Sequence, residues 1–553
     1  MDFRRSVLWV IFTASVIFLY NAWLRDHGSA GLFGGPPTVA SAPQAQGSVP
    51  QPAALGGAAL PAAAGAAAAP AVPAVKPATL TEVRTDVLDV KVSSAGGSIV
   101  YAGLRKYPSE ADPKRDVVLF DDAGGHVYMA QSGLVGGAFP NHETAMTVLP
   151  GPTTLGSAES LTLRLQSPVV GGVQLLRSYT FHRGSYVVDV RNEVINRGNV
   201  AVSPQLYLQL VRDGKEPTEN GTHFSHTFVG AAIYDSKSKF QKYEFKDIEP
   251  QAKTIQAADG WTAIVQHYFV SAWLPQPETG NRQFYLRKLG ADLYATGVML
   301  PLPQLAPGQQ AVQLDRLYVG PQIESQLQGL APGFDLVKDY GWVTIIAKPL
   351  FWVLEHIHDV LGNWGWSIIG LTILLKLLFF PLTAASYRSM ARMKAVGPRM
   401  NALRERHKDD PSAMNAAMVE MYRKEKINPL GGCLPVVIQI PVFIALYWVL
   451  QSSVELRGAP WLGWIHDLSA KDPFYILPLV MTASSFLQVK LNPTPPDPMQ
   501  ARLMWIMPLA FSVMFFMFPS GLVLYWLTNN IFSIAQQWFI NKKMGVPEFK
   551  TPS

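Results

Sequence analysis

The chain has 553 residues, of which 48% are hydrophobic and only 16% charged, and its formal net charge is +6. Soluble domains carry about a quarter of charged residues, so this composition disfavours an entirely soluble protein and indicates a membrane protein with a soluble part. The single cysteine, Cys433, excludes an intramolecular disulfide, so any exported domain must be held together by its core alone.

The N-terminus carries two arginines followed by about 19 uncharged residues, Ser6–Leu24, enough to span about 30 Å of hydrocarbon. A cleavable signal peptide has the same charged start. However, the apolar run is longer than in a signal peptide, and Tyr20 and Trp23 stand where cleavage requires small residues. We therefore predict an uncleaved transmembrane anchor over residues 1–27, with its N-terminus in the cytoplasm.

Residues 28–80 are rich in Ala, Pro and Gly and have no amphipathic period. Prolines interrupt the alanine run, so a long helix cannot form there. This composition predicts a disordered linker.

Residues 81–335 predict an all-β domain. Short runs such as "SLTLRLQS" and "SYVVDVRNEV" alternate apolar and polar residues between Gly, Asn and Pro signals, which is typical of an antiparallel sandwich. His223 and His226 lack the other ligands of a zinc site, and neither G-x-S-x-G nor H-E-x-x-H occurs in the sequence. We therefore expect a binding or scaffolding domain, with no metal and no catalytic group.

Residues 336–361 predict an amphipathic helix, kinked at Pro349. Charges at Lys348, Glu355 and Asp359 make a membrane crossing unfavourable, so we expect this helix to lie at the membrane interface.

Residues 362–541 predict five further spans, which with the anchor make six. The last apolar region, Leu503–Ile540, would be about 57 Å long as one helix. That is too long for one crossing, and "FPSG" at 518–521 supplies a break. The spans after the anchor are expected at about 364–384, 430–450 and 473–490, and as two short spans within 503–540.

Loop charges set the predicted topology. Residues 387–428 hold ten Lys or Arg against five Asp or Glu, and the short tail at 542–553 opens with two lysines, whereas the loop between the third and fourth spans has only two basic residues. Basic loops stay in the cytoplasm. We therefore expect both termini and the 387–428 loop on the cytoplasmic side, and the β domain in the periplasm.

Lys376 stands near the middle of the second span, in "GWSIIGLTILLKLLFFPLTAAS". A charge at the centre of a span costs about 2.5–3.5 kcal/mol on insertion scales, and the six predicted spans contain no Asp or Glu to neutralise it. One interpretation is that Lys376 snorkels to the nearby cytoplasmic boundary. The other is a hydrated, positively charged groove inside the bundle, open to the cytoplasm.

Polar residues that recur on one face of a helix favour the groove. They are Thr372, Lys376 and Thr383 on the second span, Gln439 on the third, Ser484 and Gln488 on the fourth, and Trp526, Asn530, Ser533 and Gln537 on the last. Cation-coupled transporters need intramembrane carboxylates, and ATP-driven pumping needs a G-x-x-x-x-G-K-[ST] loop, which the sequence lacks. A passive path for another polypeptide fits these residues better. A solute or lipid transporter with a substrate-capturing β domain is the main alternative, and a simple tether for the β domain is the other.

The 387–428 loop predicts a cytoplasmic helical hairpin that turns at "HKDDPS", with Asp410 as the N-cap of its second helix. Its basic faces suit ribosomal RNA or anionic lipid headgroups. Its methionines form either the seam of the hairpin or an adaptable contact for nascent chains. They are Met390, Met393, Met400, Met414, Met418 and Met421.

Several long segments resemble the YidC/Oxa/Alb family of membrane protein insertases. They are "INPLGGCLPVVIQIPVFIALYWVL", "SVELRGAPWLGWIHDLSAKDPFYILP" and "FPSGLVLYWLTNN", and "GWTAIVQHYFVSAWLP" at 260–275 resembles the periplasmic domain of the Gram-negative members. The resemblance implies a polytopic α-helical membrane protein of six spans, with a five-helix insertase core and a large periplasmic β-supersandwich.

The resemblance also implies a function, the insertion and folding of bacterial inner-membrane proteins, alone or beside the Sec translocon. No cofactor and no covalent step are needed, so the chain is not expected to be an enzyme. The implied partners are nascent membrane proteins, the Sec translocon, the ribosome (transiently, through cytoplasmic loops) and anionic lipids.

Lys376 aligns with a groove position that is usually arginine in the family, so the charge is kept while the planar five-donor fork is lost. The resemblance and the polar stripes together give the groove and client-contact residues expected here. They are Thr372, Gln439, Ile440, Phe443, Trp526, Asn530 and Ser533.

Overall fold

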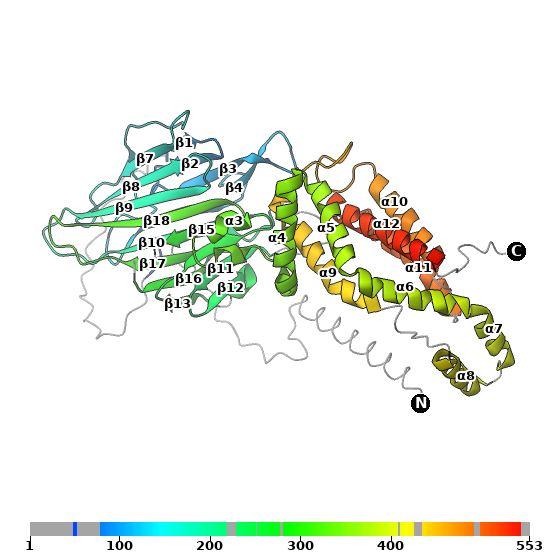
Figure 1. The fold of residues 1–553 in the computed structure, drawn as a ribbon. Coiled ribbons are helices and arrows are strands. Elements are labelled where there is room, and N and C mark those ends of the chain that lie inside the picture. The colour runs from blue at the N-terminus through cyan, green and yellow to red at the C-terminus, as the bar shows by residue number, and fades with distance from the viewer. Residues whose placement is uncertain are drawn as a thin grey trace.

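The computed structural model describes residues 48–51, 78–217, 228–249, 251–276, 280–407, 410–424, 434–491 and 498–543. The expected anchor, most of the linker, His223, His226, Cys433 and the end of the tail lie outside these ranges. A β sandwich forms one end of the described chain and a helical part forms the other, with α4 (Thr344–Leu361) standing at the junction (Figure 1).

Two nine-stranded antiparallel sheets make the β domain. The first has the order β1-β2-β3-β5-β10-β17-β16-β13, with β4 paired to β3. Its strands are β1 (Leu80–Arg84), β2 (Leu88–Ser93), β3 (Ile99–Pro108), β4 (Asp116–Phe120), β5 (Tyr128–Val135), β10 (Gln205–Asp213), β13 (Lys253–Ala257), β16 (Arg282–Gly290) and β17 (Leu293–Pro301).

The second sheet has the order β12-β11-β14-β15-β18-β9-β8-β7-β6. Its strands are β6 (Thr147–Val148), β7 (Ser160–Gln166), β8 (Val173–His182), β9 (Val187–Asn196), β11 (Gly230–Asp235), β12 (Lys239–Glu244), β14 (Trp261–Val265), β15 (Phe269–Pro275) and β18 (Gln310–Pro321). Two short helices, α2 (Phe245–Ile248) and α3 (Glu324–Gln328), complete the domain.

The sandwich forms because alternate residues along its strands are apolar. In β8 every second residue is buried, among them Val173, Leu175 and Phe181, while the residues between them are only half-buried. The two inner faces meet in one core that includes the fully buried indoles of Trp261 and Trp273. The predicted antiparallel sandwich is confirmed.

The helical part follows a pair of 3₁₀ turns, Phe334–Val337 and Gly341–Val343. The interfacial helix was expected from residue 336, but α4 begins only at Thr344, because these turns occupy the intervening chain. The helices after α4 are α5 (Trp364–Leu378), α6 (Phe380–Ala395), α7 (Gly397–Arg406), α8 (Pro411–Lys424), α9 (Leu434–Ser452), α10 (Ile476–Leu491), α11 (Pro498–Phe515) and α12 (Ser520–Lys543).

Two helix breaks shape this part. The chain bends by 64° at Phe379, between α5 and α6, so the residues expected as one span over 364–384 form two helices. Judged by length and hydropathy, no described helix alone could cross a membrane, whereas Trp364–Leu378 together with Phe380–Ser389 could as a bent pair. The break expected at "FPSG" is confirmed, since α11 ends at Phe515 and α12 begins at Ser520.

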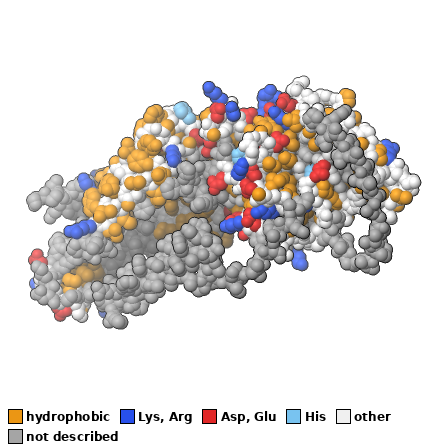
Figure 2. All heavy atoms as spheres, turned by 180° about the vertical axis from the view of Figure 1, so that it is seen from behind, with side chains coloured by type: hydrophobic (Ala, Val, Ile, Leu, Met, Phe, Trp, Pro, Cys, Tyr) orange, Lys and Arg blue, Asp and Glu red, His pale blue; other side chains and the backbone are white. Residues whose placement is uncertain are grey.

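Polar contacts join the β domain to the helical part. The Lys338 ammonium lies 3.2 Å from Glu455, and the Arg457 guanidinium donates to the Pro108 carbonyl at 2.8 Å. Figure 2 shows hydrophobic side chains gathered over the exposed helical part, at the left of that view. The protein therefore combines a soluble-type domain with a bundle whose outer surface is apolar.

Candidate functional site

Lys376 lies in the last turn of α5, just before the bend. Its side chain is half-buried, and Nζ donates to Ser533 Oγ on α12 at 2.7 Å. The Ser533 hydroxyl in turn donates to the Asn529 carbonyl at 2.8 Å. The carbonyl end of a helix favours a positive charge, which lowers the cost of placing the ammonium there. Lys376 therefore points across the bundle toward α12.

No carboxylate compensates this ammonium within the helices around it. The sequences of α5, α6 and α9 to α12 contain neither Asp nor Glu. An ammonium has three N–H donors, and Ser533 takes one of them. The cavity beside it can therefore offer donors and positive charge to an incoming acceptor.

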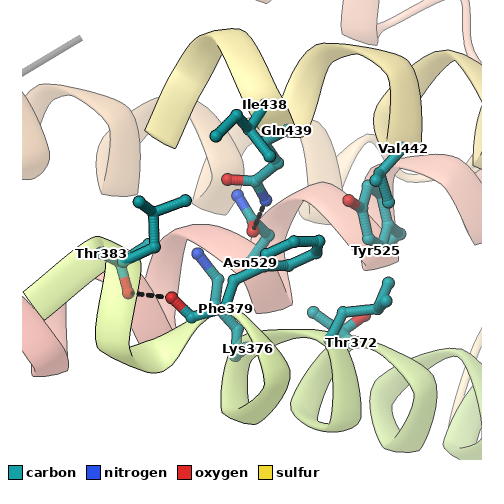
Figure 3. A pocket seen from close by; sticks show the side chains of 11 residues that line it. Thr372, Lys376, Phe379, Thr383, Ile438, Gln439, Val442, Tyr525 and Asn529 are labelled. Atoms are coloured by element: carbon teal, nitrogen blue, oxygen red, sulfur yellow. Dashed lines mark hydrogen bonds between the residues drawn. The ribbon is translucent and has the colours of Figure 1, made fainter. Parts of the chain in front are cut away.

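A cavity of about 420 Å³, including its open mouth, lies directly above Lys376, between α5, α6, α9 and α12 (Figure 3). Its wall is tied together by a hydrogen bond from Gln439 Nε2 to Asn529 Oδ1 of 2.7 Å. A second bond, from Gln536 Nε2 to Thr383 Oγ1 at 2.8 Å, ties α12 to α6. The lining residues are Thr372, Leu375, Lys376, Phe379, Leu382, Thr383, Ile438, Gln439, Val442, Tyr525 and Asn529.

A larger cavity, of about 1550 Å³ including its open mouth, shares Lys376 with the first. Its walls differ in character. Polar residues come from α5, α6, α9, α10 and α12, whereas α11 contributes only apolar side chains, namely Met504, Met507, Pro508 and Phe515. A groove with one polar and one apolar wall suits an amphipathic segment.

The groove and client-contact residues expected from the sequence all line one or both cavities. Ile440, Phe443, Trp526, Asn530 and Ser533 line the larger one, Thr372 lines the smaller one, and Lys376 and Gln439 line both. The hydroxyl of Thr372 donates to the Ile368 carbonyl, one turn earlier in the same helix, at 2.7 Å. The Trp526 ring packs edge-on against Phe443, with centroids 4.2 Å apart.

Two of the polar residues expected on the groove face, Ser484 and Gln537, line neither cavity, and some residues that do line them were not expected. Gln537 is buried against α10, where its amide donates to the Leu491 carbonyl at 3.2 Å, and it lines neither cavity. Asn529 was missed although it stands three residues after Trp526 and four before Ser533, a spacing that already placed it on the groove face. The methionines of α11 carried no such signal.

The hairpin consists of the end of α6 with α7 and α8, which contact each other. Asp410 Oδ1 accepts from the backbone N–H groups of Ser412 and Ala413 at 2.9 and 3.0 Å, as expected of an N-cap. Met400 is buried and its sulfur accepts from the Tyr422 hydroxyl, which favours the seam interpretation. Met414, Met418 and Met421 are half-buried, while the side chains of Met390 and Met393 lie outside the described residues.

Within the described ranges, no group of His, Cys, Asp and Glu could hold a metal ion. The arrangement at Lys376 thus offers hydrogen bonding, charge and an apolar wall.

Comparisons with known proteins identify relatives of both the β domain and the helical part. Residues 356–547 match the family model described as 60Kd inner membrane protein, and residues 80–353 match the YidC periplasmic domain. A membrane protein insertase YidC of Burkholderia cenocepacia is 52% identical over 99% of both chains, and one of Cupriavidus necator is 54% identical over 99% of this chain and 98% of its own. A crystal structure of an active YidC insertase, 18% identical, covers 84% of this chain and 94% of its own with a TM-score of 0.38.

Proposed function

Because the chain belongs to the YidC family of membrane protein insertases, and is an inner-membrane insertase with a periplasmic domain, we propose that the two cavities around Lys376 form the site that receives its clients. The main support for this proposal is that the Lys376 ammonium lies in a cavity whose surrounding helices contain no Asp or Glu. A polar or acidic segment of a client would lie against Lys376, Gln439 and Asn529.

The apolar wall formed by α11 would receive the apolar residues of the client. The client's apolar residues would contact α11 and then lipid, while its polar residues stay in the groove. Burial of apolar surface contributes roughly 25 cal/mol per Å², so a client's own span supplies the driving force. The groove has only to shorten the distance that the polar segment crosses in hydrocarbon, which requires neither a cofactor nor a covalent step.

The site is proposed to open to the cytoplasm. The β domain is periplasmic, and α7 and α8 lie at the end of the helical part farthest from it (Figure 1). This arrangement supports a cytoplasmic hairpin, and its net positive charge supports transient contact with the ribosome and with anionic lipids. Cooperation with the Sec translocon belongs to the same proposal.

A charge series at Lys376 tests the role of the groove. K376R, K376A and K376E would each be assayed in cells depleted of the wild-type protein, with a single-span client that has an acidic translocated tail and with the same client neutralised. K490A is the matched control, because Lys490 lies in the last turn of α10 with an exposed side chain.

Insertion of the acidic client should persist in K376R, weaken in K376A and fail in K376E, with smaller losses for the neutral client. Equal insertion of both clients by all three variants would refute the charge attraction. Losses of the same size in K490A would show that total charge, and not the groove, governs insertion.

A further inference from the structure

Part of the outer face of the first β sheet, on β10 and β16, is buried. On β10 and β16, Leu208 and Leu286 point into the sandwich core, so their neighbours point away from it. The outward residues should meet water, yet their exposed fractions are 0% for Tyr207 and Gln209, 5% for Tyr285 and 7% for Arg287. Something outside the sheet must therefore cover them.

The cover includes the linker segment Ser48–Gln51. Arg287 donates to two successive carbonyls, Ser48 through Nη2 and Val49 through Nη1 at 3.2 Å. The Gln209 amide also approaches the Ser48 carbonyl, at 3.4 Å. The Val49 side chain packs against a cluster of four buried residues, Val135, Tyr207, Tyr285 and Met299. From Ser48 to Pro50 the linker is therefore packed, contrary to the disorder expected of it, whereas Gln51 is exposed.

The receiving residues are held in place by one another. Gln209 accepts from the Tyr285 hydroxyl at 2.9 Å and donates to Gln131 at 2.8 Å. Gly297 lies between Gln209 and Tyr285 on the intervening strand, and a Cβ there would come within 2.4 Å of the tyrosine oxygen. The absence of a side chain at Gly297 thus leaves the space that this network occupies. These contacts within the sheet do not involve the linker segment.

The occupant also suits the site chemically. A buried guanidinium must recover the hydrogen bonds that it loses from water, and peptide carbonyls supply acceptors without a charge. Pro50 is buried too, and because proline has no N–H, its backbone brings no donor that would need a partner.

From this geometry we propose that the outer face of the first sheet is a peptide-binding site, and that its ligand is the chain's own linker segment Ser48–Gln51. Recognition rests on two consecutive carbonyls bound by Arg287 and Gln209, and on one valine in the pocket of Tyr207, Tyr285 and Met299.

Docking limits the reach of the N-terminus. If the expected anchor ends at residue 27, an undocked linker of 52 residues before β1 could extend to at most about 180 Å. With Ser48 docked, 20 residues remain between the anchor and the site, and their greatest extension is about 70 Å. The docked segment would thus keep the end of the N-terminal span within about 70 Å of the β domain.

Disulfide trapping in the full-length protein tests the proposal. In a C433S background, V49C is paired with M299C, which lies beneath it, or with the matched control V312C, which is 40% exposed on the other sheet. Under mild oxidation we expect V49C/M299C to cross-link at least tenfold faster than V49C/V312C, and R287M to slow that reaction at least tenfold. Equal rates for the two pairs would overturn docking, and an unchanged rate in R287M would overturn the role of the guanidinium.

A second measurement does not depend on how R287M folds. The single cysteine M299C should react with a maleimide at least tenfold faster when residues 48–51 are replaced by four glycines, a change that leaves the β domain itself unaltered. An unchanged labelling rate would show that the segment does not cover the site, and would refute the proposal.

Discussion

Removal of the Glu455 carboxylate should strongly weaken the junction between the β domain and the helical part. The Lys338 side chain is fully buried, and Nζ lies 3.2 Å from both oxygens of Glu455, whose own side chain is only 11% exposed. The ammonium also lies 3.7 Å from the centroid of the Phe351 ring on α4. E455Q therefore leaves a buried cation compensated only by the aromatic ring and by its electrostatic interaction with the Glu355 carboxylate.

The magnitude follows from that geometry. Breaking a buried ion pair by removing one partner costs about 3–5 kcal/mol. The cation–π contact, worth about 2 kcal/mol when desolvated, persists in E455Q, so we expect the lower end of that range. For a cooperative unit of about 250 residues, about 3 kcal/mol corresponds to a fall in Tm of about 6 °C.

Thermal unfolding of the purified protein in detergent would measure this fall. E110Q is the matched control, because Glu110 lies 3.6 Å from Arg457 at the same junction but is itself 37% exposed. The buried Arg457 keeps its hydrogen bond to the Pro108 carbonyl in E110Q, so the loss should be smaller than in E455Q. The apolar double variant K338M/E455M should recover most of the loss, since no unpaired charge remains. The reasoning fails if E455Q lowers Tm no more than E110Q does, or if the double variant is less stable than E455Q alone.

Three further outcomes can be measured. G365A should destabilise the protein by about 1–3 kcal/mol, because the added Cβ would lie 2.2 Å from the Trp461 ring. G397A is the control, since its Cβ would meet nothing within 4 Å. Equal Tm values for the two variants would contradict this expectation. Burial lowers the pKa of His267 to about 4, below the ordinary 6.5, so the unfolded chain binds the proton first and stability falls as the pH drops through that window. Between pH 7 and pH 5, His267 should lower the free energy of unfolding by about 2 kcal/mol. In H267Q this free energy should depend less on pH by the same amount, and parallel pH profiles of the variant and the wild type would rule out the contribution of His267. D410A should destabilise α8 by about 1 kcal/mol, because the helix loses its N-cap, and amide exchange should become faster in the hairpin alone. Exchange at the wild-type rate would show that the cap does not stabilise α8.

Much of the functional site was accessible from sequence because helical periodicity is a local property. Spacings of three and four placed Asn530 and Ser533 on one face of a helix with Trp526, and the absence of acids from the spans singled out Lys376. The same spacing included Gln537, which the structure instead packs against α10. Periodicity identifies a face of a helix but does not say which neighbour covers each part of it.

The sequence by itself determined the β sandwich, the helix break at "FPSG" and the uncompensated charge of Lys376. These features follow from the alternation of apolar and polar residues, from turn residues and from composition, all of which are local properties of the sequence. Only the tertiary structure decided the 64° bend at Phe379, the apolar wall that α11 contributes and the docking of Ser48–Gln51 on the first sheet. These features depend on contacts between segments that are distant in sequence. Such contacts are fixed by packing and by the need to satisfy buried polar groups, and no local pattern encodes them.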